Sequence, residues 1–375
     1  MLWQIAPAIA NRRKPVTRRE GRHMAGLDTA LARPIWWTSF MVGLALVGAV
    51  LVFGSRFLIP LAVAVILWLL INAIGRAYRR IGIGGFRLPE SLCRLLAVLT
   101  MLYFGWLIVG ISASNIAQVR AAAPVYQANL NQLIVQAMGT FGIERTPTAT
   151  EIISRFDLVA LLGSLTAALG ALVGNAGLVM LYVAFLMLEQ SSFQRKLGAL
   201  FADPVRTASL RQSLGEIERR IEGYLWIKTL VSLITAVLCY AVLAAVGVDF
   251  ASFWALLIFL FNYIPSIGSL FAVLLPTLLT LLQFGDLGVF VLVLVSLSLI
   301  QAVMGNLVEP RLMGRTLNLS PLVIILSLTF WGSIWGVAGM FLCVPLTALL
   351  AIVLGKFEGT RPVAILLSSD GRLAE

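Results

Sequence analysis

The sequence predicts an all-α, polytopic membrane protein with about six full spans plus two broken or re-entrant helical hairpins. Hydrophobic residues make up 60% of the 375 residues, 12% are charged, and the mean hydropathy is +0.96, which a single soluble core could not accommodate. The apolar runs have the length that a helix needs to cross roughly 30 Å of hydrocarbon, and they do not alternate as barrel strands would. Two of the runs are interrupted in the middle by proline and glycine, which predicts the hairpins.

Composition also excludes several functional classes. The net charge of +11 does not indicate nucleic-acid binding, because the basic residues cluster beside apolar runs, as in the cytoplasmic loops of membrane proteins. The three cysteines lie in or beside apolar runs and are interpreted as small core residues. The single histidine, His23, lies in a basic segment, so we expect no histidine-built metal centre and no cofactor.

The N-terminal part is predicted to form a basic tail and a three-span unit. Residues 1–33 are interpreted as a cytoplasmic topology anchor, which we favour over a dedicated site for anionic lipids. Spans are expected at residues 35–54, 57–74 and 92–113, the first two forming a tight hairpin. Five arginines near the loop after the second span place that loop in the cytoplasm: Arg76, Arg79, Arg80, Arg87 and Arg94.

The rest of the chain alternates between polar segments and apolar runs, and a helix is expected to start at Pro204. The predicted organisation is a basic cytoplasmic tail (1–33), a three-span unit (34–114), an external amphipathic segment (115–158), a fourth span (159–188), a cytoplasmic helical segment (189–222), a transport core (223–357) and a cytoplasmic C-terminal tail (358–375).

The first hairpin follows from counting membrane crossings. Residues 229–308 contain no lysine or arginine, and an odd number of crossings must separate the external Asp249 from the cytoplasmic Arg311. Only two apolar runs lie between them, so one must enter and leave by the same face. The run 250–282 is chosen because Pro265 cannot donate to the carbonyl of residue 261, which predicts two half-helices and a freed carbonyl.

The same count predicts a second hairpin in residues 317–354, turning near residues 331–336. The two halves, residues 223–283 and 287–355, would then form an inverted repeat, an arrangement from which many secondary transporters are built. Trp331 in the second turn is interpreted, with Trp335, as an interfacial anchor rather than a ligand-stacking ring.

A charged segment lies within the second half, between the apolar run that ends near Gly305 and the run 317–354. Pro310 is expected to end the incoming helix at Glu309, while Ser320 followed by Pro321 predicts the N-cap and first residue of the next helix. Broken helices leave polar backbone groups that hydrocarbon tolerates only inside protein or beside a watery cavity. We therefore predict a substrate or ion pathway built from both regions: Asn262, Tyr263, Pro265, Ser266, Gly268, Asn306, Glu309, Arg311, Ser320 and Pro321.

Alternatives remain for these residues. The break near Pro265 could be a proline kink satisfied by a neighbouring hydroxyl, and the charges near Glu309 could be ordinary cytoplasmic anchors. The motifs in combination nevertheless form a pattern over roughly residues 35–357: Asn262-Tyr263-Ile264-Pro265 with Gly268, Glu309-Pro310-Arg311-Leu312-Met313-Gly314 with Leu319-Ser320-Pro321, and Trp331-Gly332 with Gly336, Gly339 and Val344-Pro345.

This pattern resembles the autoinducer-2 exporter family of bacterial permeases. The resemblance implies a multi-pass transporter of the bacterial inner membrane that forms homo-oligomers, in a family linked to export of the furanone-type signal autoinducer-2 and, for some members, to sodium/proton exchange. Both termini are expected in the cytoplasm, and the partners are a small-molecule or ion substrate and membrane lipids.

The sequence thus favours a secondary transporter that exports a small polar solute, such as an autoinducer-2-type signal, or ions. The alternatives are a sodium/proton antiporter or a passive channel. A membrane-embedded enzyme is disfavoured, because the sequence has no His-Glu-x-x-His zinc motif, Gly-x-Ser-x-Gly elbow or paired intramembrane aspartates.

Overall fold

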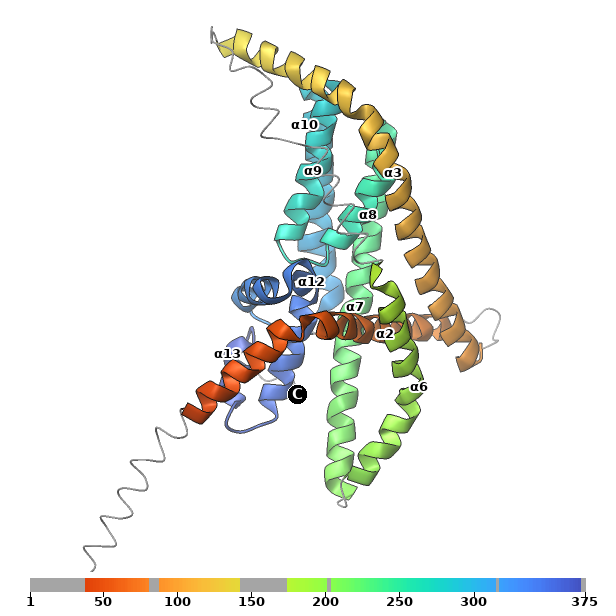
Figure 1. Cartoon of the computed structure of the whole chain (residues 1–375), viewed down its shortest axis with the longest axis vertical. Helices are drawn as coiled ribbons and strands as arrows, with labels where there is room; N and C mark the ends of the chain where they lie inside the picture. The colour runs from red at the N-terminus through yellow and green to blue at the C-terminus, as the bar shows by residue number, and fades with distance from the viewer. Residues whose placement is uncertain (1–37, 81–87, 142–173, 201–203, 315–316, 372–375) are drawn as a thin grey trace, which may run out of the picture. The chain divides into compact units, whose positions relative to one another are not determined.

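The computed structural model describes residues 38–80, 88–141, 174–200, 204–314 and 317–371 (Figure 1). In these ranges the chain is helical, apart from turns and one isolated β-bridge between Leu319 and Ser368. The chain divides into two compact units, Met1–Ser55 and Arg56–Glu375. The described part of the first unit is one apolar helix, Thr38–Phe53.

The remaining helices, all but the first residue of α2, belong to the second unit. In order they are α2 (Ser55–Arg80), α3 (Glu90–Phe141), α6 (Ala176–Leu200), α7 (Pro204–Val246), α8 (Ala251–Phe261), α9 (Ile267–Phe284), α10 (Leu287–Val303), a π-helix η1 (Met304–Val308), α11 (Glu309–Met313), α12 (Pro321–Gly355) and α13 (Arg361–Leu367).

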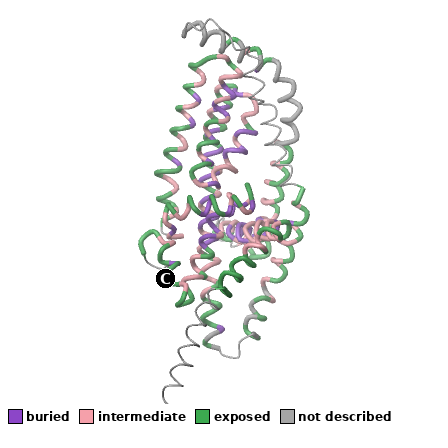
Figure 2. The backbone as a smooth tube through the Cα atoms, turned by 60° about the vertical axis from the view of Figure 1, so that its left-hand side comes forward, coloured by how far each residue is buried: buried purple, intermediate pink, exposed green. Residues whose placement is uncertain are grey.

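Six helices of the described chain are long and apolar enough to cross a membrane, which confirms the all-helical polytopic class. Two of the six, α9 and α12, belong to the predicted hairpins. Large apolar side chains are exposed along the six helices. On α10, for example, Leu287 is 65% and Leu299 is 62% exposed. Figure 2 shows exposed and buried residues mixed along the same helices. Such surfaces suit lipid contact, because a soluble protein rarely exposes apolar patches of this extent.

The larger hydrophobic core surrounds the α8–α9 pair. Side chains of α3, α7 and α10 enclose the two short helices, with Trp254, Leu279 and Leu297 each 1% exposed or less. A second cluster joins α2, α3 and α6 around Ala64, Ala97 and Val183. The first core thus holds the predicted hairpin rigidly against its neighbours.

One predicted boundary differs from the structure and another agrees with it. Helix α3 passes residue 114 without a break and reaches Phe141, so the start of the predicted external segment continues the third span. The rest of that segment and the first half of the predicted fourth span lie outside the described residues, and α6 carries the chain onward from Ala176. Helix α7 starts at Pro204, as predicted, because proline is favoured in the first turn of a helix.

The expected helix end at Glu309 is wrong. After α10 the helix widens into η1, where the amide of Glu309 donates to the carbonyl of Met304, and continues as α11 to Met313. Pro310 is accommodated in the first turn of α11, directly after the widened π-turn of η1, where the fixed φ of proline suits the helix. The helix ends instead at Gly314, whose φ of 53° suits a residue without Cβ.

Candidate functional site

The first hairpin is broken where the sequence predicts. Helix α8 ends at Phe261, α9 starts at Ile267, and Ser266 between them has a φ of 59°. The Phe261 carbonyl is not free, however, because it accepts a hydrogen bond from the amide of Ile264 at 2.8 Å. The prediction of an unsatisfied carbonyl there was wrong, since the five-residue turn forms its own backbone bonds.

Gly268 allows the two arms of this hairpin to meet. A Cβ placed on Gly268 would lie 1.8 Å from the carbonyl oxygen of Phe261, far below any contact distance. The second hairpin has the same close glycine–carbonyl contact, because a Cβ on Gly339 would lie 1.9 Å from the carbonyl oxygen of Trp331. In each hairpin a glycine of the second arm thus packs on a backbone carbonyl of the first arm.

The second hairpin is formed inside α12. Gly336 has a φ of 60° and a ψ of −140°, which divides α12 into two arms at the turn that the sequence predicts. The indole Nε1 of Trp331 donates to Oγ1 of Thr347 at 3.1 Å, linking one arm to the other. Trp331 and Trp335 are 9% and 8% exposed and contact each other with ring centroids 5.3 Å apart and planes at 49°, so their interpretation as interfacial anchors was wrong.

The two hairpins meet at one aromatic pair. The ring of Tyr263, in the turn of the first hairpin, lies on the ring of Phe341, in the second arm of α12, with centroids 6.2 Å apart and planes at 27°. The Tyr263 hydroxyl lies 2.7 Å from Oγ1 of Thr229 in α7. Because Thr229 donates its own proton to the carbonyl of Leu225, Tyr263 is the donor.

Polar groups from other helices reach the same turn. Nε2 of Gln301, near the end of α10, donates to Oδ1 of Asn262 at 3.3 Å. In α7, one residue before Thr229, Nζ of Lys228 lies 2.5 Å from Oε1 of Glu309. The buried Tyr224, one turn earlier in α7, is close enough to Glu309 and Tyr263 to interact electrostatically with both. The turn of the first hairpin is therefore surrounded by hydroxyl, carboxamide and charged groups.

Lys228 is the residue that sequence reasoning missed. It is the last lysine or arginine before residues 229–308, which contain neither, and it lies near the start of the predicted transport core (223–357). A lone lysine inside a membrane span is rare and usually has a charged or polar partner. Its position in the sequence could therefore have identified Lys228 as a candidate site residue. Glu309 could not be paired with it from the sequence, because 81 positions separate them.

Four predicted site residues lie apart from this cluster. Asn306 and Arg311 are exposed on η1 and α11. Ser320 is the N-cap of α12 and Pro321 its first residue, as predicted, but Ser320 makes no side-chain capping bond. Its amide instead donates at 3.0 Å to the carbonyl of Leu367, in a short pairing with the C-terminal segment.

The end of the first hairpin away from its turn is tied by α3 and by the hairpin itself. Oη of Tyr126 donates to Oδ2 of Asp249 at 2.8 Å, and Nδ2 of Asn129 donates to the carbonyls of Leu282 and Gln283 at 3.0 and 2.7 Å. Oε1 of Gln283 accepts from the amide of Asp249 at 2.8 Å. These bonds fix both outer ends of the hairpin to the extension of α3.

A buried polar stripe runs along α7 past the cluster. Lys228, Ser232 and Thr235 are each 8% exposed or less. Thr235 bonds the carbonyl of Val231, whereas Oγ of Ser232 is buried without a hydrogen-bond partner in the part of the chain that the structure describes. In the same part, no cluster of three or more acidic, histidine or cysteine side chains is placed to hold a metal ion. Polar groups buried in this way inside an apolar helix mark pathways for polar solutes in membrane proteins.

The comparisons with known proteins agree with this architecture. The model of the AI-2E family of transporters matches residues 40–359. The chain is 32% identical over 323 residues to the AI-2 transport protein TqsA of Escherichia coli, in an alignment that covers 84% of this chain and 90% of the relative. It is 34% identical over 289 residues to a protein of Haemophilus influenzae named as a transport protein, with 75% and 82% of the two chains covered. This multi-pass membrane protein therefore belongs to the AI-2E family of transporters.

Proposed function

We propose that this chain is a secondary transporter that exports a small polar solute across the bacterial inner membrane by alternating access, with both termini in the cytoplasm. The observation that carries the proposal is the meeting of two broken hairpins at Tyr263 and Phe341. Discontinuous helices facing each other are the common way in which secondary transporters build a site inside the bilayer. The aromatic pair closes the path, and separating its rings opens it.

The ion pair of Lys228 and Glu309 holds the closed state. It joins α7 to α11, and the side chains are 10% and 22% exposed, so water screens the pair weakly. Through Gln301 and Asn262 the turn of the first hairpin is attached to α10, the helix that leads into η1 and Glu309. A movement of η1 that separates the ion pair therefore also pulls on the hairpin turn. Wide turns of this kind are frequent at functional sites.

The lining of the site favours an uncharged solute with several hydroxyl or carbonyl groups. Tyr263, Thr229, Asn262 and Gln301 offer hydrogen-bond donors and acceptors without net charge, and the two charges beside them compensate each other. The name of the Escherichia coli relative includes autoinducer-2, and its furanone form has this chemistry. We propose an autoinducer-2-type molecule as the substrate.

Flux from liposomes tests the proposal. Wild-type chain in liposomes loaded with the furanone form of autoinducer-2 should release it faster than protein-free liposomes. The variant Glu309→Gln should lower this rate at least tenfold, a difference of about 1.4 kcal/mol or more, because alternating access requires the ion pair to break and form again in each transport cycle. Imposed proton and sodium gradients, applied in separate runs, identify the driving ion from the gradient that accelerates release.

The matched control is Glu189→Gln, which removes a carboxylate that is 52% exposed and far along the chain from the hairpins. It should release solute at the wild-type rate. Equal release by wild type and Glu309→Gln, at equal amounts of folded protein, would overturn the proposed site.

A further inference from the structure

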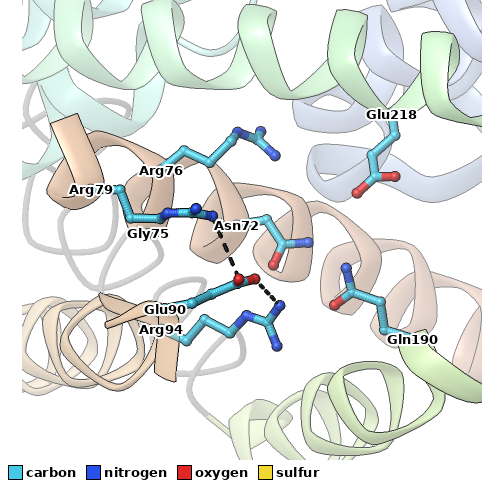
Figure 3. Close-up of a pocket in the computed structure, with 8 residues that line it drawn as sticks. All are labelled: Asn72, Gly75, Arg76, Arg79, Glu90, Arg94, Gln190 and Glu218. Atoms are coloured by element: carbon cyan, nitrogen blue, oxygen red, sulfur yellow. Dashed lines mark hydrogen bonds and ion pairs between the residues drawn. The ribbon is translucent and has the colours of Figure 1, made fainter. Parts of the chain in front are cut away.

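A second polar site lies at the end of α2, away from the two hairpins. It is a pocket of about 140 Å³ between α2, α3, α6 and α7 (Figure 3). Apart from Gly75, it is lined by polar or charged residues: Asn72, Arg76, Arg79, Glu90, Arg94, Gln190 and Glu218. The transport site described above uses none of these residues.

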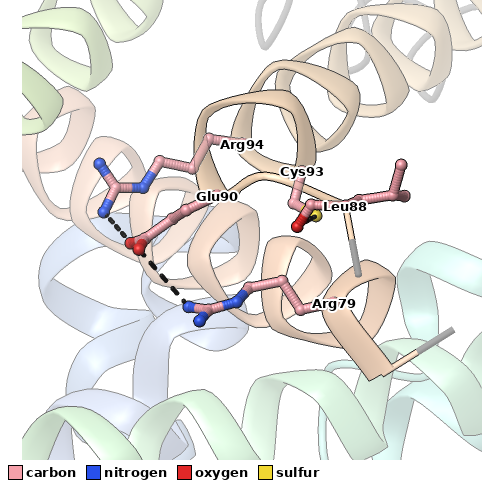
Figure 4. A network of polar contacts seen from close by, with 5 residues as sticks. All are labelled: Arg79, Leu88, Glu90, Cys93 and Arg94. Atoms are coloured by element: carbon pink, nitrogen blue, oxygen red, sulfur yellow. Dashed lines mark hydrogen bonds and ion pairs between the residues drawn. The ribbon is translucent and has the colours of Figure 1, made fainter. Parts of the chain in front are cut away.

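One wall of the pocket carries an excess of positive charge. The guanidinium of Arg94 lies 2.5 Å from Oε1 of Glu90, and that of Arg79 lies 3.7 Å from Oε2 of the same carboxylate (Figure 4). Two cations thus share one anion. Near Glu90, at the start of α3, the Cys93 thiol makes a weak contact with the Leu88 carbonyl at 3.9 Å.

The opposite wall carries a negative charge. Glu218 of α7 makes no ion pair with any residue that the structure describes, although it interacts electrostatically with Arg76. Arg76 forms an ion pair with a different carboxylate, the buried one of Glu222. Figure 3 shows Glu218 on the side of the pocket away from Glu90 and Arg94.

Carboxamides occupy the space between the two walls. In Figure 3 the side chains of Asn72 and Gln190 lie between Glu90 and Glu218. Nδ2 of Asn72 is buried without a hydrogen-bond partner among the described residues. Leaving a buried amide unpaired costs about 1–3 kcal/mol, so an acceptor supplied by a ligand would be bound favourably there.

We infer that this pocket binds a zwitterion that carries a phosphate at one end and a primary ammonium at the other, the chemistry of a phosphoethanolamine head group. Guanidiniums bind phosphate oxygens through paired hydrogen bonds, which assigns the phosphate to Arg79 and Arg94. A primary ammonium donates three hydrogen bonds, which assigns it to Glu218 and the carboxamide oxygens. The pocket lies in the last turns of a membrane-crossing helix, which is the level of lipid head groups.

Thermal unfolding of the full-length chain in detergent tests this assignment. The protein is titrated with phosphatidylethanolamine, phosphatidylcholine and phosphatidylglycerol of matched short acyl chains, and separately with soluble phosphoethanolamine. Phosphatidylethanolamine should raise the unfolding midpoint at roughly tenfold lower concentration than the other two lipids, because choline has no N–H donor and glycerol has no charge.

Variants locate the binding in the pocket. Glu218→Gln should abolish the preference for phosphatidylethanolamine over phosphatidylglycerol, and Arg79→Gln with Arg94→Gln should abolish stabilisation by all three lipids. The controls Arg80→Gln and Glu189→Gln remove neighbouring exposed charges that do not line the pocket, and both should keep the preference. Glu218→Gln keeps the side-chain shape, so it decides the question even if the double arginine variant does not fold.

The soluble probe distinguishes the source of the ligand. A response to phosphatidylethanolamine alone assigns the pocket to lipid, and a response that soluble phosphoethanolamine shares shows that the head group suffices. A response to the soluble compound alone assigns the pocket to a free zwitterion. Equal stabilisation by the three lipids, unchanged by Glu218→Gln, would overturn the inference.

Discussion

Nζ of Lys228 in α7 lies 2.5 Å from Oε1 of Glu309 in α11, and the two side chains are only 10% and 22% exposed. The pair is the structural link between the long helix that bears the buried polar stripe and the π-helical segment that follows α10. Burying two charges requires removing their hydration, which is unfavourable. Removing only one partner is also unfavourable, because the other charge then stays buried without compensation. The contribution of this ion pair to the free energy of unfolding can therefore be measured by removing one charge or both.

Removing one charge of this pair should destabilise the protein more than removing both. Lys228→Gln or Glu309→Gln alone leaves an uncompensated buried charge and should cost about 3–5 kcal/mol, whereas the double variant leaves none and should cost less than either. The measurement is the free energy of unfolding of the wild type, the two single variants and the double variant in mixed micelles. The exposed pair Lys196 and Glu189 is the control, and Lys196→Gln should cost less than about 1 kcal/mol. Additive costs at Lys228 and Glu309 would contradict the pairing.

Adding a methyl group at either hairpin glycine should be strongly destabilising. A Cβ at Gly268 or Gly339 would lie within 2 Å of a backbone carbonyl oxygen, and the arms must separate to admit it. We expect Gly268→Ala and Gly339→Ala each to cost about 3 kcal/mol or more and to lower the amount of folded protein. Gly305→Ala is the matched control in η1, because no atom lies within 4 Å of its added Cβ. Equal stability of the three variants would show that the arms do not pack closely.

The hydrogen bond between Tyr263 and Thr229 should appear as a coupling energy. Tyr263→Phe keeps the ring on Phe341 and removes only the hydroxyl, 2.7 Å from Thr229. Each of Tyr263→Phe and Thr229→Val should cost about 1 kcal/mol, and the double variant should cost less than the sum by a similar amount. The readout is the free energy of unfolding of the four proteins. Strict additivity would mean that the two hydroxyls do not interact.

Much of the fold could be predicted because its signals are local. The break at residues 262–266 followed from Pro265 and Gly268, and the turn in α12 followed from the glycines near Trp335. Periodicity and backbone chemistry decide such features within a few residues. The same local reasoning failed at Pro310. The helix was expected to end before this proline, but it widens into the π-helix η1 and continues past Pro310 to Met313.

The contacts that assemble the site could not be predicted, because they join residues far apart in the chain. Lys228 meets Glu309, and Tyr263 meets Phe341, through the packing of whole helices. The interior of the second hairpin was misjudged for the same reason. Tryptophan is common at membrane interfaces, and only the position of Thr347 shows that the indole of Trp331 is buried and bonded between the arms.

The bond between Tyr126 and Asp249 should make stability depend on pH in the alkaline range. Burial, and then the hydrogen bond to Asp249, raise the pKa of Tyr126 above its ordinary value of about 10. A phenol whose pKa is higher in the folded state stabilises the protein fully below the unfolded pKa. This contribution is lost as the pH rises above about 10 toward the folded pKa.

The difference between wild type and Tyr126→Phe isolates this effect. At pH 8 the variant should be less stable by about 1–2 kcal/mol, because Asp249 loses a donor on its carboxylate. As the pH is raised from 9 to roughly 11 the wild type loses stability to the ionising phenol and the variant does not, so the gap should narrow. Tyr240→Phe, at an exposed position, is the control for loss of a tyrosine hydroxyl away from this contact. A constant gap for Tyr126→Phe across this range would mean that its hydroxyl does not hold α3 against the outer end of the first hairpin.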